Sequence, residues 1–204
     1  MARYRPIVEA LALLAATFPL AVGLHLPTLW FLTPFAVLTV SRRSYAAYGL
    51  SVRRPGSAGL HATVIGTIFV PYAVAHWALA SYWSGATLHF RLPDSFLRSV
   101  FDQVLLIGLP EEFFFRGYLQ TQLDQAWGRP YRFGAAPWGV GLPVAALLFA
   151  TCHLINGGPV RLIVFFPGLL YGWLRARTGT ILVPALYHAG SNLLMQIMVA
   201  SLSP

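Results

Sequence analysis

The chain is poor in charged residues. Only 10% of its 204 residues are Asp, Glu, Lys or Arg, whereas 57% are hydrophobic. A soluble domain carries about a quarter charged residues, so this composition excludes a soluble protein with a large core, because too few charges remain to cover a water-facing surface. Apolar runs of about eighteen residues or more recur along the chain, and each is long enough to cross a bilayer. We therefore expect an integral membrane protein.

Lysine is absent, and all fourteen basic residues are Arg. Most lie in short segments between apolar runs, which is typical of loops that stay on the cytoplasmic side of a membrane. No basic stretch alternates with aromatic residues on a soluble module. The net charge of +8 therefore does not indicate nucleic acid as a partner. The paired basic residues are Arg3 and Arg5, Arg42 and Arg43, Arg53 and Arg54, Arg129 and Arg132, and Arg175 and Arg177.

Cysteine is nearly absent, with Cys152 alone. An internal disulfide and a thiolate metal cluster are therefore excluded. Cys152 is next to His153, but adjacent residues point about 100° apart on a helix. We interpret Cys152 as a small buried apolar residue. The sequence also lacks a separate soluble domain, an internal repeat and a low-complexity segment.

The apolar runs predict an all-α fold, a polytopic transmembrane helix bundle of about seven spans, with six to eight compatible with the pattern. We expect one integral membrane domain. Residues 1–97 form its N-terminal helices and a basic loop, and residues 98–204 form a helix bundle of the last four spans, which contains the candidate site residues given below. The predicted spans are residues 7–24, 28–41, 60–83, 98–121, 138–155, 159–175 and 180–200.

Seven spans place the two termini on opposite sides of the membrane. All five Arg pairs then fall on the N-terminal side, whereas Arg91, Arg98 and Arg161 fall on the other. Because basic loops stay in the cytoplasm, the N-terminus is predicted to be cytoplasmic. We expect the membrane to be that of a bacterial or archaeal cell.

The fourth predicted span contains ionisable residues. The chain has three Glu, and Glu111 and Glu112 both lie in this span, followed by Arg116. Charged groups at mid-membrane usually pair or line a water-filled cavity. Glu112 and Arg116 are four residues apart, which favours a buried ion pair. Glu111 points elsewhere and has no partner on its own helix, so we interpret it as a general base. The alternative is that all three form one structural ion cluster.

Two later spans carry polar groups in hydrocarbon. Phe149 and His153 share a face of the fifth span, and His188 and Asn192 share a face of the seventh. A lone His in an apolar helix is more often a hydrogen-bonded core residue, and polar residues also join transmembrane helices. Unsatisfied polar groups there cost several kcal/mol. Three helices that each present such groups therefore favour one shared site.

Read together, these segments form three motifs on successive helices: Glu-Glu-x-x-x-Arg at 111–116, Phe-x-x-x-His at 149–153 and His-x-x-x-Asn at 188–192. Their order and spacing resemble the CPBP family of intramembrane proteases, also called the CAAX protease and bacteriocin-processing or Abi family. The resemblance covers roughly residues 98–200, and the motif positions show no departure from it.

The resemblance implies an intramembrane endopeptidase of the glutamate type. Glu111 matches the glutamate that activates a water, and His153 matches a histidine that assists it. His188 and Asn192 match residues that stabilise the oxyanion, whereas Glu112, Arg116 and Phe149 are assigned supporting roles. We expect a peptide or protein substrate near the membrane surface, such as the C-terminal region of a lipidated or membrane-anchored protein, and membrane lipids around the chain. The sequence does not specify an oligomeric state.

Three alternatives stay open. Glu111, His153 and His188 are a ligand set that zinc accepts, although the chain has no His-Glu-x-x-His helix and the resemblance favours chemistry without a metal or other cofactor. A second alternative is a non-catalytic immunity or partner-binding protein of the same family. The third is a transporter, although no inverted repeat is visible.

The predicted spans also contain a conflict. Glu111 and His188 lie nearer the N-terminal side of the membrane, whereas His153 lies nearer the opposite end of its span. At about 1.5 Å per residue the mismatch in depth is on the order of 10 Å. A later start of the fifth helix, which Pro143 would permit, would reduce it.

Overall fold

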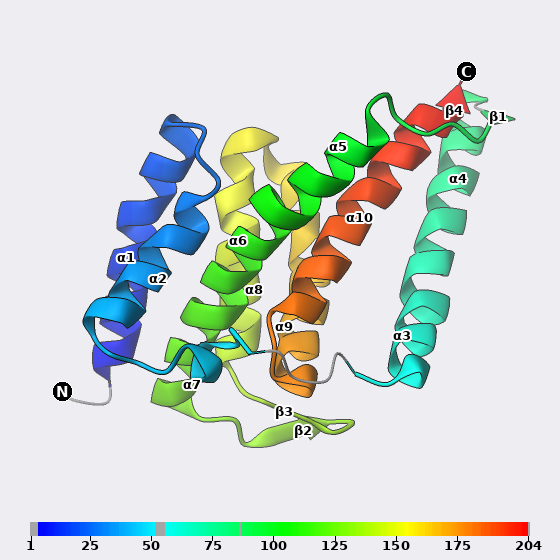
Figure 1. Ribbon diagram of the computed structural model, residues 1–204. Helices are drawn as coiled ribbons and strands as arrows, with labels where there is room; N and C mark the ends of the chain where they lie inside the picture. Colours follow the sequence, from blue (N-terminus) through cyan, green and yellow to red (C-terminus); the bar gives the residue numbers. More distant parts are fainter. Residues whose placement is uncertain (1–3, 52–55, 86, 204) are drawn as a thin grey trace.

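The computed structural model describes residues 4–51, 56–85 and 87–203, and most of these are helical (Figure 1). Three helices are uninterrupted in α geometry over much of their length: α1 (Arg5–Gly23), α2 (Leu29–Val40) and α10 (Leu182–Ser201). Two more each adjoin a 3-10 segment: α8 (Gly141–Cys152) is followed by His153–Asn156, and α9 (Phe165–Thr178) is preceded by Pro159–Val164.

Two long helices contain π-helical segments. The first runs from α3 (Ala58–Val64) through Ile65–Phe69 into α4 (Val70–Ser84). The second is built of five consecutive pieces, and we call it the central helix. Its pieces are α5 (Phe96–Phe101), the π segment Asp102–Gly108, α6 (Leu109–Glu112), the π segment Phe113–Leu119 and α7 (Gln120–Trp127).

The central helix crosses the molecule diagonally, and the other helices pack around it (Figure 1). The pair α1 and α2 packs on α7, α6 and the second π segment, and α8 packs on α7 and α9. Helix α10 packs along the first π segment, α6 and α9. The helix α3–α4 stands at the edge of the bundle beyond α10, and its apolar stretch is only 6% buried. An apolar helix with so little protein cover is suited to contact lipid.

Aromatic side chains fill the interior beside the central helix. Phe113, Phe114 and Phe115 are each at most 1% exposed, and Trp30 of α2 packs edge-on against Phe114 at 4.8 Å between ring centroids. Phe115 contacts Phe149 of α8 in the same edge-on manner at 5.0 Å. Such pairs stabilise by about 0.5–1.5 kcal/mol beyond their buried area. The run of three Phe thus joins the N-terminal helices to the C-terminal ones.

Two glycines allow α9 to approach the central helix closely. A Cβ atom on Gly168 would lie 3.2 Å from Nη2 of Arg116, and one on Gly172 would lie 2.9 Å from Oε1 of Gln120. Arg116 and Gln120 instead donate hydrogen bonds to the carbonyls of Gly168 and Gly172, each at 3.3 Å. Small residues at this spacing permit close helix packing in membranes.

The described chain is mostly helical, in agreement with the predicted all-α fold, and it also contains four short strands that were not predicted. Strands β2 (Tyr131–Phe133) and β3 (Ala136–Trp138) form an antiparallel hairpin, turned by Gly134 at φ +59°. Strands β1 (Thr87–Leu88) and β4 (Leu202–Ser203) pair at the opposite end. A backbone that leaves a helix still needs partners for its N–H and C=O groups, and these short ribbons supply them.

The helix limits differ from the predicted spans mainly around the hairpin. The central helix continues to Trp127 instead of ending at 121, and α8 begins at Gly141 instead of 138. Pro143 lies in the first turn of α8, where a missing N–H breaks no helical hydrogen bond. Among the described residues, Arg5–Gly23 and Ala58–Trp83 are long and apolar enough to cross a membrane, and Leu29–Val40 and Gly141–Ile155 are shorter apolar helices.

The two ends of the bundle differ in charge. The end with the N-terminus and the β2–β3 hairpin carries seven described Arg, whereas its carboxyl groups are Glu9 and Asp124 (Figure 1). At the other end Arg91 and Arg98 face Asp94 and Asp102 at 3.8 and 3.7 Å. Arg3, Arg53 and Arg54 lie outside the described residues. The Arg at the first end are Arg5, Arg42, Arg43, Arg129, Arg132, Arg175 and Arg177.

Candidate functional site

Glu112 is the centre of a buried polar cluster. Its side chain is 0% exposed, and Nη1 of Arg116 donates to its Oε1 at 2.9 Å. Nη2 of Arg116 donates to the carbonyl oxygen of Gly168. The i,i+4 spacing read from the sequence therefore does form the expected pair. A buried pair of this kind is destabilising to break, because the remaining charge loses its partner.

His188 of α10 connects the two glutamates. Its Nδ1 lies 2.9 Å from Oε1 of Glu112, and its Nε2 lies 3.9 Å from Oε2 of Glu111. Oε1 of Glu112 accepts from Arg116, and we assign Nδ1–H of His188 as a second donor to the same oxygen. This bond leaves Nε2 directed to Glu111. A hydrogen bond on one ring nitrogen fixes the chemistry available to the other.

Each glutamate keeps one unpartnered oxygen. Oε2 of Glu111 and Oε2 of Glu112 are buried and accept no hydrogen bond within the described part of the chain. Leaving a buried charged oxygen without a donor is unfavourable by about 1–3 kcal/mol or more. The side chain of Glu111 is 15% exposed, whereas Glu112 is fully enclosed. Glu111 is thus the carboxyl that a reactant can reach.

Aromatic rings enclose the side chains of Arg116 and His188. The guanidinium of Arg116 lies 4.2 Å from the ring centroid of Phe149 and 5.3 Å from that of Tyr171. The imidazole of His188 stacks on Tyr171 at 5.3 Å, and Phe149 meets it edge-on at 5.7 Å. Desolvated contacts between a cation and an aromatic face contribute about 2 kcal/mol. Phe149, predicted as a supporting residue, therefore contacts both groups.

The backbone around the glutamates departs from α geometry. The single α turn Leu109–Glu112 lies between the π segments Asp102–Gly108 and Phe113–Leu119. Gly108 lets α10 come close, since a Cβ there would lie 2.9 Å from the carbonyl oxygen of Ala185. Short π segments inside helices occur frequently at functional sites. They place Glu111 and Glu112 opposite the face of α10 that carries His188.

Asn192 lies one turn beyond His188 but belongs to a different hydrogen bond. Its Nδ2 donates to Oε1 of Gln103 at 2.7 Å. Gln103 lies in the first π segment of the central helix. The second N–H of the Asn192 amide is not used by this bond. Asn192 is therefore held with its amide donor group fixed by the helix that carries the glutamates.

His153 is not hydrogen-bonded to the other predicted catalytic residues in the described structure. Its Nδ1 donates to the carbonyl oxygen of Phe149 on its own helix at 2.8 Å. The Phe149 ring contacts both His153, at 4.5 Å, and His188, at 5.7 Å. Phe149, one turn before His153, contacts both Arg116 and His188 of the cluster.

The predicted alternative zinc set does not converge. Among the residues that the structure describes, no three His, Cys, Asp or Glu side chains are arranged to hold a metal ion. His188 contacts both glutamates, whereas the hydrogen bond of His153 is to its own backbone.

Three residues of the cluster could not be predicted from its motifs. Gln103, Gly168 and Tyr171 contact Asn192, Arg116 and His188, respectively. Gly168 and Gly172 are four residues apart, which is a signal for close helix packing. Gln103 is polar within a predicted span, which is a signal for a functional or interhelical role. Tyr171 carries no such signal, because a Tyr in an apolar helix is ordinary.

One family model matches the chain. Its description is Type II CAAX prenyl endopeptidase Rce1-like, and it matches residues 93–194. The matched range includes Glu111, Glu112, Arg116, Phe149, His153, His188 and Asn192. No curated protein and no solved structure matches the chain.

Proposed function

Because the chain belongs to the family of Type II CAAX prenyl endopeptidase Rce1-like proteins, we propose that it hydrolyses a peptide bond of a membrane-anchored substrate with Glu111 as general base. The family consists of membrane peptidases, and the apolar helices of this chain agree with that setting. The observation that supports the assignment of the base is the position of His188 between the two glutamates. Glu112 is ion-paired with Arg116 and fully enclosed, whereas the side chain of Glu111 is 15% exposed and its buried Oε2 accepts no hydrogen bond from the described residues.

The proposed reaction uses water as the nucleophile. A carboxylate oxygen of Glu111 takes one proton from the water as its oxygen attacks the carbonyl carbon of the scissile peptide. The negative charge moves to the carbonyl oxygen, where the remaining N–H of Asn192 and Nε2–H of a protonated His188 stabilise it. Glu111 then returns the proton to the leaving amine. His153, with Nδ1 bonded to the Phe149 carbonyl, is the proposed partner of the water through its Nε2.

Glu112 and Arg116 support this chemistry indirectly. Glu112 holds the His188 ring by Nδ1, and Arg116 donates a hydrogen bond to the same carboxyl oxygen of Glu112. Fixed donors act strongly in a site that excludes water. The cluster is arranged so that the charge on Glu112 is neutralised by two donors while Glu111 stays available.

The substrate we propose is the C-terminal region of a lipidated protein, and the words "CAAX prenyl endopeptidase" in the description of the family support this choice. We further propose that the helices form seven spans with the Arg-rich end in the cytoplasm. Seven helical segments that alternate in direction, and termini at opposite ends of the bundle, support this topology (Figure 1).

The test is cleavage of a fluorogenic peptide with a C-terminal CAAX sequence, prenylated or unmodified, by purified protein in lipid nanodiscs. Wild type is expected to cleave, and Glu111→Gln to lose cleavage while it elutes and unfolds as wild type does. Full activity in Glu111→Gln would refute the assignment of the base. Failure of the wild type on every peptide, together with unchanged protection of cells by a variant with Glu111, His153 and His188 all replaced, would support the non-catalytic alternative.

Metal dependence is tested in the same assay. We expect activity to survive treatment with EDTA and 1,10-phenanthroline. Loss of activity that added zinc restores would instead favour zinc-dependent hydrolysis by the same residues.

A further inference from the structure

We propose that Tyr171 is a positioning residue for the reaction, which holds the imidazole of His188 in the orientation that serves Glu111 and Glu112. The inference rests on the proposed function and adds to it a residue outside the three motifs. Tyr171 lies on α9 and its side chain is almost fully buried, with 2% of the residue exposed. Its ring contacts His188 and Arg116. Within the described structure, Tyr171 makes no hydrogen bond to either glutamate.

The rings of Tyr171 and His188 are nearly parallel. Their planes differ by 12° and their centroids lie 5.3 Å apart. Phe149 meets the same imidazole from α8 at 85° and 5.7 Å. One aromatic ring therefore covers a face of the imidazole while another meets it edge-on. Terminal torsions of His are broad and roughly two-fold, so contacts with neighbours have to select one of the two ring orientations.

The ring orientation matters because the two edges of imidazole differ. In the observed orientation Nδ1 lies 2.9 Å from Glu112 and Nε2 lies 3.9 Å from Glu111. Rotation of the ring by about 180° would put a carbon where Nδ1 is now, and the bond to Glu112 would be lost. Misplacement of a catalytic group by about 1 Å can reduce a rate about 100-fold. A ring that samples both orientations would therefore lower turnover.

The hydroxyl group of Tyr171 anchors this arrangement to the helix that carries His188. Tyr171 donates to Oγ of Ser191 at 2.7 Å, and Ser191 donates to the carbonyl oxygen of Tyr187 at 2.9 Å. Tyr187 and Ser191 lie on either side of His188 along α10. Tyr171 thus contacts α10 twice, by its ring and by its hydroxyl. Close packing of α9 on the central helix at Gly168 and Gly172 fixes the position of Tyr171 relative to α10.

The experiment compares Tyr171→Leu and Tyr171→Phe in the nanodisc cleavage assay. Leu removes the stacked ring, so kcat is expected to fall about 10- to 100-fold while KM stays within about twofold. Phe keeps the ring and loses only the hydroxyl bond, so kcat is expected to fall by a factor of about five or less. The matched control is Tyr118→Leu, which removes another fully buried Tyr with a bonded hydroxyl, outside the cluster. The control should lose stability but keep kcat per folded molecule.

A second readout does not depend on turnover. In ¹⁵N-histidine-labelled protein, the signals of His188 are assigned by their loss in His188→Ala. Wild type is expected to show one ring environment with Nδ1 protonated, and Tyr171→Leu is expected to show averaging or two environments. An unchanged His188 spectrum in Tyr171→Leu, or kcat equal to that of the control, would overturn the proposal. If wild type cleaves no peptide, the proposed function fails, while the spectrum still decides the role of Tyr171. If Tyr171→Leu does not fold, Tyr171→Phe and Ser191→Ala test the hydroxyl bond between Tyr171 and Ser191 instead. A fall in kcat is expected in both variants, and an unchanged kcat in both would contradict the proposal.

Discussion

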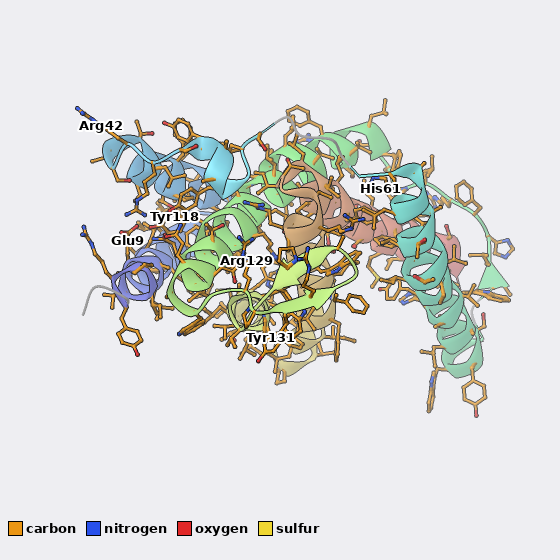
Figure 2. The ribbon with its side chains drawn as sticks, turned by 90° about the horizontal axis from the view of Figure 1, so that it is seen from below. Glu9, Arg42, His61, Tyr118, Arg129 and Tyr131 are labelled. Carbon is orange, nitrogen blue, oxygen red and sulfur yellow. The ribbon has the colours of Figure 1, made fainter. Side chains whose placement is uncertain are left out.

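Two glutamates on the central helix and its neighbours each form an ion pair with an Arg. They differ in how many of their carboxylate oxygens accept hydrogen bonds. Glu9 of α1 accepts from Arg43, Tyr118 and Gln122 through Oε1, and from Arg43 again through Oε2. Figure 2 shows Glu9 and Tyr118 beside each other near the Arg-rich end. Both of its oxygens are used. Glu112 accepts only through Oε1, and its neighbour Glu111 keeps a buried oxygen without a donor.

The comparison separates a structural ion cluster from a reactive one. A carboxylate with all its lone pairs occupied has nothing left to offer a substrate or a water. The Glu9 cluster joins α1 and the segment after α2 to the central helix, and it is complete without a ligand. The Glu111–Glu112 cluster is incomplete, which is expected of a site that binds a reactant.

Exposure also distinguishes the clusters. The side chains of Glu9 and Arg43 are 25% and 28% exposed, whereas those of Glu112 and Arg116 are 0% and 1% exposed. The hydrogen bonds that Arg43 donates to Glu9 raise the pKa of its guanidinium above its usual range, although burial opposes this. Arg42, next in sequence, projects away from the bundle into the surroundings (Figure 2). The Glu9 cluster therefore forms at the boundary of the bundle, where water can share the charge.

The largest difference is expected in activity. Glu111→Gln should lower kcat by about 10²- to 10⁴-fold, the range for loss of a general base. Glu9→Gln keeps the shape of a side chain whose role is structural, so kcat per folded molecule should stay within about threefold. Steady-state kinetics on both variants, normalised to the folded fraction, measures the contrast. Equal losses would mean that Glu9 also serves the reaction and would remove the distinction between the clusters.

The next contrast is in stability. Arg116→Ala leaves Glu112 buried with a single donor and should lower the free energy of unfolding by about 3–5 kcal/mol. Arg43→Ala removes a partly solvated pair and should cost about 1 kcal/mol. Thermal unfolding in one detergent, followed by helical circular dichroism, compares the two. A larger loss in Arg43→Ala would show that the boundary cluster is the stronger of the two.

A substitution on α9 tests how the reactive cluster is supported. A Cβ on Gly172 would lie 2.9 Å from both Oε1 of Gln120 and Cγ of Leu142, so Gly172→Ala should destabilise by about 1–3 kcal/mol. Gly190→Ala is the matched control, because no atom lies within 4 Å of the added Cβ. The same thermal assay applies. Similar melting of both variants would mean that α9 can move away without loss.

The smallest expected effect concerns Asp124, a carboxyl on the central helix beyond the predicted span. Burial raises the pKa of Asp124 from 3.8 to about 6, while Arg129 and Arg175 oppose the shift. Because the folded pKa is the higher one, the stabilisation is present below about pH 4 and is lost as pH rises through 6. Asp124→Asn should remove this dependence and stabilise the protein at pH 8 by about 1 kcal/mol. Unfolding curves from pH 4 to 8 measure it, and a slope that persists in the variant would contradict the assignment.

The sequence was sufficient to predict most of the helices, because long apolar runs are strong signals. It was sufficient to predict the family because three motifs occur in order on successive helices. It also predicted the Glu112–Arg116 pair, since the spacing along one helix determines that contact. The hairpin at 131–138 was predicted as a loop, because its strands are three residues each and their ladder bonds depend on partners that no local pattern reveals. Membership of the family is confirmed by the match at 93–194.

The site was predictable only in part. That Glu111 and His188 face each other follows from the packing of α10 on the π-containing helix, and a regular α-helical projection could not place this contact. The hydrogen bond of Asn192 to Gln103 crosses between helices in the same way. The roles of Glu111, His153, His188 and Asn192 stay predictions until the variants are measured.

The π segments on either side of Glu111 have a consequence for how this sequence can change over generations. A π turn closes an i→i+5 hydrogen bond where an α turn closes i→i+4, so each segment stores one extra residue. Deleting a single residue from Asp102–Gly108 would let that stretch return to an α-helix, and the turns on either side would keep nearly the same orientation, because the wide turn had already absorbed the extra residue. In a regular α-helix the same deletion would rotate the two sides by about 100° relative to each other. This part of the central helix is therefore more tolerant of a one-residue deletion than a regular helix is, and the change would be confined to the segment next to Glu111.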